Sequence, residues 1–128
     1  MKIFTIVIFL LLLAYYSWNQ SKNKSDEMPE ISSIEGMKFM SNSNYIFLDV
    51  RTTAEHKAVS IPNTSVIPVQ ELASRLNEIQ KFKKKKIIVY CRSGNRSRKG
   101  TAILINAGFD AVNLIGGMNQ WQGPVEKR

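Results

Sequence analysis

The sequence contains a single cysteine, Cys91, and a single histidine, His56, among its 128 residues. One cysteine excludes a disulfide framework and every metal site that needs two or more thiolates. A zinc site would lack the ligands it requires, so we expect no bound metal. Acidic residues are also scarce, with 10 Asp and Glu against 18 Lys and Arg, and the resulting net charge of +8 favours anionic partners.

The chain contains neither an internal repeat nor a second long apolar run. Hydrophobic residues make up 44% of the sequence and charged residues 22%, which is enough to build a core and excludes a largely disordered chain. The length accommodates one domain with a short tail or anchor. The same composition excludes a protein with several membrane spans.

The one long apolar run covers residues 3–18 and ends in aromatic side chains suited to a membrane interface. As a helix it would measure about 24 Å, short for a hydrocarbon core of about 30 Å. We expect residues 1–18 to be a transmembrane anchor that holds the protein at the cell membrane. A cleaved signal, which would leave the domain periplasmic or secreted, is the first alternative, although residues 15–18 lack a small-residue cleavage site. A buried core helix is the second.

Residues 19–28 are polar and predict a linker, so the folded domain is expected over residues 29–128. Short apolar runs alternate there with helical patterns. Strands are predicted at 45–48, 65–67, 87–90 and 111–115, and helices at 31–40, 52–57, 72–79, 97–107 and 118–121. This alternation predicts an α/β fold with a mainly parallel central sheet and helices on both faces. Asp49 and Cys91 each follow a strand, where such sheets bind ligands, so both could face one site.

Cys91 begins a polar loop, Arg92-Ser93-Gly94-Asn95-Arg96, and a helix is predicted from Ser97. Backbone N–H groups of such a loop can form an anion-binding nest, and the helix N-terminus adds partial positive charge. Arg92 and Arg96 add full charges. These effects favour the thiolate and lower the cysteine pKa, and the thiolate is the nucleophilic form. A structural, buried cysteine is the alternative.

This loop resembles the active-site loop of the rhodanese-domain sulfurtransferases, and three further segments resemble that family in the same order. They are Leu48-Asp49-Val50-Arg51 with Glu55, then Ile61-Pro62 with Val66-Ile67-Pro68, and finally Leu114-Ile115-Gly116-Gly117-Met118 with Trp121. The resemblance extends over residues 29–121. It departs from the family at 59–64, where two glycines and a histidine are absent, and at His56, which we expect on the surface or partly buried.

The resemblance implies a sulfurtransferase with a rhodanese-like fold that works without a cofactor. Cys91 would take a sulfane sulfur from a small anionic donor such as thiosulfate, become a persulfide, and pass the sulfur to a thiol or cyanide-like acceptor. The expected substrate-binding residues are Arg92, Ser93, Gly94, Asn95, Arg96 and Ser97. Asp49 and Arg51 are expected to support the site, either by orienting a loop arginine or as a structural ion pair.

Two other functions are weighed against sulfur transfer. The first is a non-catalytic rhodanese-like module that binds a partner at the membrane, which the loop composition disfavours. The second is a phosphatase or arsenate reductase, whose loops in related proteins carry one residue more than the span from Cys91 to Arg96. Nucleic acid is not an expected partner, because the lysine-rich residues 81–86 include a single aromatic side chain for base stacking. A monomer is expected.

Overall fold

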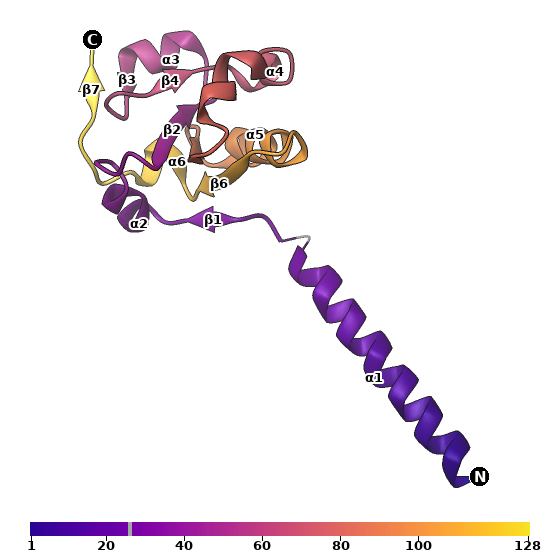
Figure 1. The fold of residues 1–128 in the computed structure, drawn as a ribbon. Coiled ribbons are helices and arrows are strands. Elements are labelled where there is room, and N and C mark those ends of the chain that lie inside the picture. Colours follow the sequence, from indigo (N-terminus) through magenta and orange to yellow (C-terminus); the bar gives the residue numbers. More distant parts are fainter. Residues whose placement is uncertain (26) are drawn as a thin grey trace.

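The computed structural model describes residues 1–25 and 27–128 (Figure 1). Helix α1 (Lys2–Ser25) is followed by the folded domain. Its residues Lys2–Lys22 are long and apolar enough to cross a membrane, and none of the apolar window is buried, although a signal sequence would pass the same test. The helix continues through residues 19–25, which were predicted to be linker, because they include neither proline nor glycine to end it. Asp26 lies outside the described residues.

The central sheet has five parallel strands, as the alternation of elements predicts. Their spatial order is β1 (Glu30–Ile31), β6 (Asp110–Leu114), β5 (Lys86–Tyr90), β2 (Tyr45–Asp49) and β4 (Ser65–Val66). A separate antiparallel pair joins β3 (Val59–Ser60) to β7 (Glu126–Lys127). Since the large sheet is parallel, the carboxyl ends of its strands lie along one edge.

Helices cover both faces of the sheet, so the predicted rhodanese-like α/β architecture is confirmed. The helical elements are α2 (Ser33–Lys38), α3 (Thr53–Ala58), α4 (Val69–Leu72), the 3-10 helix η1 (Leu76–Phe82), α5 (Asn95–Asn106) and α6 (Gly117–Gln120). Ile87 and Val89 of β5 pack with residues of α4, η1 and α5. Ile88 and Tyr90 pack on the other face, toward Met118 of α6 and the residues after α2. The continuous apolar run of β5 is thus explained by burial on both sides.

Two predicted helices are divided in the structure. The stripe at 72–79 is split, because α4 ends at Leu72 and η1 begins only at Leu76, after Arg75 leaves helical geometry. Residues 31–40 begin instead as a strand, because Ile31 pairs with Leu114 at the edge of the sheet. Helix α2 follows, and the Ser32 side chain accepts a hydrogen bond from the Glu35 N–H as its N-cap.

Candidate active site

Strands β2 and β5 bring the two predicted strand-end residues to the same edge of the sheet. Asp49 pairs in register with Tyr90, and Cys91 follows directly. Cys91 has 0% of its surface exposed. The loop after it leads into α5, which begins at Asn95, two residues earlier than predicted. The thiol therefore lies under a loop that turns sharply from strand to helix.

The sulfur of Cys91 is surrounded by hydrogen-bond donors from this loop. The Gly94 N–H donates to Sγ at 3.1 Å and the Ser97 N–H at 3.4 Å, and the Ser97 hydroxyl lies 3.3 Å away. Burial of the thiol raises its pKa, but the hydrogen bond with the Ser97 side chain and the hydrogen bonds from the N–H groups of Ser97, Gly94 and Ser93 outweigh it. The pKa of Cys91 is therefore lowered.

The residues that follow the Gly116-Gly117 turn are hydrogen-bonded to the backbone at the start of the cysteine loop. The Met118 N–H donates to the Cys91 carbonyl and the Asn119 N–H to the Arg92 carbonyl, each at 2.9 Å. Gly117 has a φ of +51°, and a Cβ there would lie 2.2 Å from the Cys91 carbonyl oxygen. Gly94, with a φ of +102°, packs against the Gly116 backbone from the loop side. Glycine is required at both contacts because the two backbones approach so closely.

Asn113 of β6 links the two ends of the cysteine loop and was not among the predicted site residues. The Ser97 hydroxyl donates to its Oδ1, and its Nδ2 donates to the Gly94 carbonyl at 3.4 Å. The side chain is 1% exposed. A polar residue inside an otherwise apolar strand is a sequence signal for such a buried contact, since an unpaired amide there is costly.

Arg96 is held by Glu55 of α3. The two guanidinium nitrogens Nη1 and Nη2 lie 2.7 and 2.9 Å from Oε1 and Oε2 of the carboxylate. Glu55 also accepts hydrogen bonds from the Thr52 N–H and hydroxyl, which completes a capping box at the start of α3. The hydrogen bond from Arg96 lowers the pKa of Glu55 to about 2.

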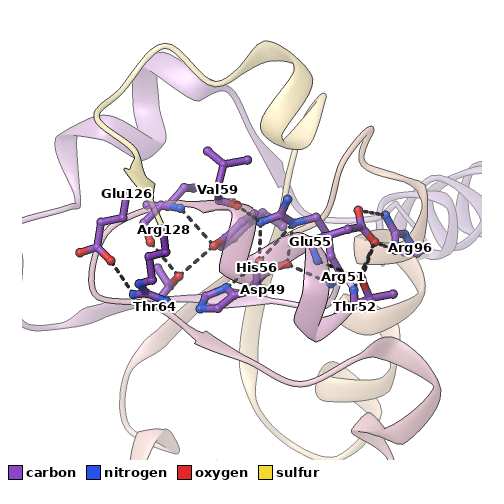
Figure 2. A network of polar contacts seen from close by, with 12 residues as sticks. Asp49, Arg51, Thr52, Glu55, His56, Val59, Thr64, Arg96, Glu126 and Arg128 are labelled. Atoms are coloured by element: carbon purple, nitrogen blue, oxygen red, sulfur yellow. Dashed lines mark hydrogen bonds and ion pairs between the residues drawn. The ribbon is translucent and has the colours of Figure 1, made fainter.

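Asp49 and Arg51 form a buried pair with each other and do not orient Arg96. Arg51 donates to both carboxylate oxygens of Asp49, with Nη2 2.8 Å from Oδ2, and to the Val59 carbonyl. Of the two roles weighed for this pair, these contacts fit the structural ion pair. Figure 2 shows Asp49 between Arg51 and His56, with Glu55 reaching toward Arg96.

His56 is buried, with 7% of its surface exposed, and not at the surface or half-buried as expected. Its Nδ1 lies 2.9 Å from Oδ2 of Asp49. The carboxylate of Asp49 thus accepts from Arg51 and also contacts the His56 ring. His56 is therefore part of the buried polar contacts around Asp49, which its position on α3 alone did not indicate.

Two surface pockets border the cysteine loop. One, of about 440 Å³, is lined by Arg92, Glu55, Met118 and Asn119 among others. The other, of about 320 Å³, is lined by Arg96, Asn95 and Lys99 with residues of α4. Arg92 and Ser93 have exposed side chains, whereas Gly94 and Ser97 are buried. The predicted binding residues thus divide into a buried set around the sulfur and an exposed set at the pockets.

The family model for the rhodanese-like domain matches residues 35–124, which is most of the chain. The chain belongs to the rhodanese-like family.

Three curated relatives of this rhodanese-like domain carry names from sulfur chemistry, and others are named as tRNA uridine(34) hydroxylases. The chain is 32% identical to the adenylyltransferase and sulfurtransferase MOCS3 of Arabidopsis thaliana, over 77% of its own length and 25% of that protein. It is 33% identical to the putative sulfur carrier protein YrkF of Bacillus subtilis, covering 83% of this chain and 57% of the other. A sulfurtransferase of Allochromatium vinosum is 36% identical over 59% of this chain and 70% of its own. The chain therefore spans only part of the first two relatives.

Solved structures agree with this assignment. The rhodanese-like domain protein from Staphylococcus aureus superposes with a TM-score of 0.71 at 32% identity, covering 79% of this chain and 99% of that one. A rhodanese-related protein from Thermoplasma volcanium superposes with a TM-score of 0.70 at 30% identity, covering 77% of this chain and 97% of the other.

The Glu55–Arg96 pair predicts a pH-dependent contribution to the stability of this rhodanese-like domain. Because Arg96 lowers the Glu55 pKa from 4.5 to about 2 in the folded state, the contribution is fully present above pH 4.5. It is lost as the pH falls through about 2. We expect Glu55→Gln to lower the free energy of unfolding by about 1 kcal/mol at pH 7 and by much less near pH 2. Urea titrations of both proteins across this range measure the difference, and a pH-independent difference would contradict the assignment.

Proposed function

We propose that this protein is a sulfurtransferase in which Cys91 carries a sulfane sulfur as a persulfide. The observation that supports it most is the pair of backbone donors on Sγ, namely the N–H groups of Gly94 and Ser97. These donors stabilise a thiolate, and they are placed to stabilise the terminal sulfur anion of a persulfide as well. The family assignment and the names of the relatives agree with this chemistry.

The reaction proceeds in two displacements. The Cys91 thiolate attacks the outer sulfur of thiosulfate, the bond from that sulfur to the sulfonate breaks, and sulfite leaves with the electron pair. Arg92, exposed at the pocket, holds the oxyanion, while the loop N–H groups hold the growing charge on sulfur. In the second step an acceptor such as cyanide or a thiolate attacks the terminal sulfur and releases the Cys91 thiolate.

The complete burial of the thiol favours the alternative of a non-catalytic, partner-binding module. Because Cys91 has no exposed surface, a donor reaches the sulfur only when part of the surrounding shell moves. The lowered pKa of Cys91 argues for a reactive thiol despite that burial. The six-residue span from Cys91 to Arg96 continues to disfavour phosphate as a substrate.

Mass spectrometry of the full chain in detergent, after incubation with thiosulfate, tests the proposal. We expect a gain of one sulfur, about 32 Da, that cyanide or dithiothreitol reverses, since a persulfide terminal sulfur transfers to either nucleophile. Cys91→Ser serves as the control and should gain nothing. An unchanged mass together with a thiol that alkylates with an ordinary pKa near 8.5 would leave the binding module as the function.

We also propose that residues 3–18 hold the domain at a membrane. The apolar, unburied helix over Lys2–Lys22 supports this, because 21 residues span about 31 Å, the thickness of a hydrocarbon core. After expression of the full chain, we expect the protein in the membrane fraction, resistant to extraction at high pH, with an intact N-terminus. A soluble product whose mass lacks the helix would instead establish a cleaved signal.

A further inference from the structure

The positive charges around Cys91 are largely compensated by neighbouring carboxylates. Arg96 is bound by Glu55 through both carboxylate oxygens, and Arg51 is bound by Asp49 in the same way. Of the two loop arginines, both in the described part of the chain, Arg92 alone has no ion pair. Arg92 is therefore the loop arginine whose charge no carboxylate of the described residues offsets.

Glu55 also lies at a pocket beside the cysteine loop. Its carboxylate is 29% exposed. It lines the same pocket of about 440 Å³ as Arg92, while its partner Arg96 lines the second pocket, of about 320 Å³. Arg96 keeps the pKa of Glu55 near 2, so the carboxylate is charged at neutral pH. An anion in this pocket is attracted by Arg92 and repelled by Glu55.

We propose that Glu55 determines the donor class of this site by disfavouring dianions such as thiosulfate relative to sulfur donors of single charge. Organic thiosulfonates and the persulfides of small thiols belong to the favoured class. The inference rests on the proposed sulfur transfer and specifies its substrate. One extra negative charge about 6 Å from a carboxylate, at an effective dielectric constant of about 60, corresponds to roughly a fivefold change in rate.

Methanethiosulfonate isolates the effect of donor charge. The Cys91 thiolate attacks its outer sulfur, the same sulfur–sulfur bond breaks as in thiosulfate, and methanesulfinate leaves with the electron pair. A methyl group replaces one charged oxygen, so the two donors differ mainly by one negative charge. Any change in the reactivity of the thiolate itself affects both donors alike and cancels in the ratio of their kcat/KM values.

The experiment compares this ratio in the full chain, in Glu55→Gln and in Glu78→Gln. Glutamine at position 55 keeps an acceptor for the Thr52 N–H, so the start of α3 is preserved. Glu78 is the matched control, because it is bound by Arg75 through two similar contacts on η1 and does not line the pocket. We expect the thiosulfate-to-methanethiosulfonate ratio to rise about fivefold in Glu55→Gln and to stay constant in Glu78→Gln.

The outcomes separate this inference from the proposed function. If the unmodified protein forms a persulfide with neither donor, sulfur transfer itself fails and the inference falls with it. If both donors react and Glu55→Gln changes both rates equally or not at all, sulfur transfer stands and the role of Glu55 is overturned. Arg92→Gln provides a second variant at an exposed position, where the ratio should fall about fivefold; an unchanged ratio there would also contradict control by donor charge.

Discussion

Replacing Gly117 with alanine is expected to destabilise the domain by about 3 kcal/mol and to abolish persulfide formation. The added Cβ would lie 2.2 Å from the Cys91 carbonyl oxygen and 2.9 Å from the Arg92 carbonyl carbon, both backbone atoms. The backbone of the loop cannot yield without losing the hydrogen bonds from Met118 and Asn119 that hold it. Urea unfolding and the thiosulfate mass assay measure the two effects.

Gly108→Ala is the control for this substitution. Gly108 also has a positive φ, of +86°, but a Cβ there would meet only the Lys83 side chain at ordinary distances of 3.5 and 3.7 Å. We therefore expect a cost of about 1 kcal/mol from the backbone conformation alone, with persulfide formation intact. Equal losses in the two variants would show that backbone strain, and not the contact with Cys91, explains the requirement for glycine.

Strand β5 is the element that the sequence predicts best. Four consecutive apolar residues ending at Cys91 predict a strand buried on both faces, and both faces are indeed covered. The antiparallel pair of β3 and β7 was not predicted, because two-residue strands are too short to show a period. Strand β1 was not predicted for the same reason, and its Ile31 also fits a helical pattern.

The candidate site divides in a similar way. Cys91 and its loop stand out in the sequence as a candidate site, because a thiol, two arginines and a glycine lie within six residues. The residues of other elements that bind this loop could not be predicted. Glu55, 41 positions from Arg96, and Asn113, 16 positions from Ser97, are brought to the loop only by the packing of α3 and β6. Charge alone did not reveal whether Asp49 or Glu55 binds the loop arginine.

Ser97→Ala should separate the effect of the hydroxyl from that of the backbone on the thiol. Loss of the hydroxyl removes the side-chain hydrogen bond between Ser97 and Sγ while the Ser97 and Gly94 N–H groups stay in place. When the thiolate forms, the hydroxyl can turn its proton from Asn113 to the sulfur, so we expect the Cys91 pKa to rise when the hydroxyl is lost. The midpoint of the pH–rate curve for iodoacetamide alkylation should therefore lie at higher pH than in the unmodified protein.

Ser93→Ala is the matched control in the same loop, because Ser93 acts on the thiol through its backbone and exposes its side chain. Its pH–rate curve for alkylation should coincide with that of the unmodified protein, while the curve of Ser97→Ala moves to higher pH. If all three curves coincide, the backbone N–H groups alone set the pKa, and the link from Asn113 through Ser97 serves only to hold the loop in shape. A shift confined to Ser97→Ala would instead make that hydroxyl part of the chemistry at Cys91.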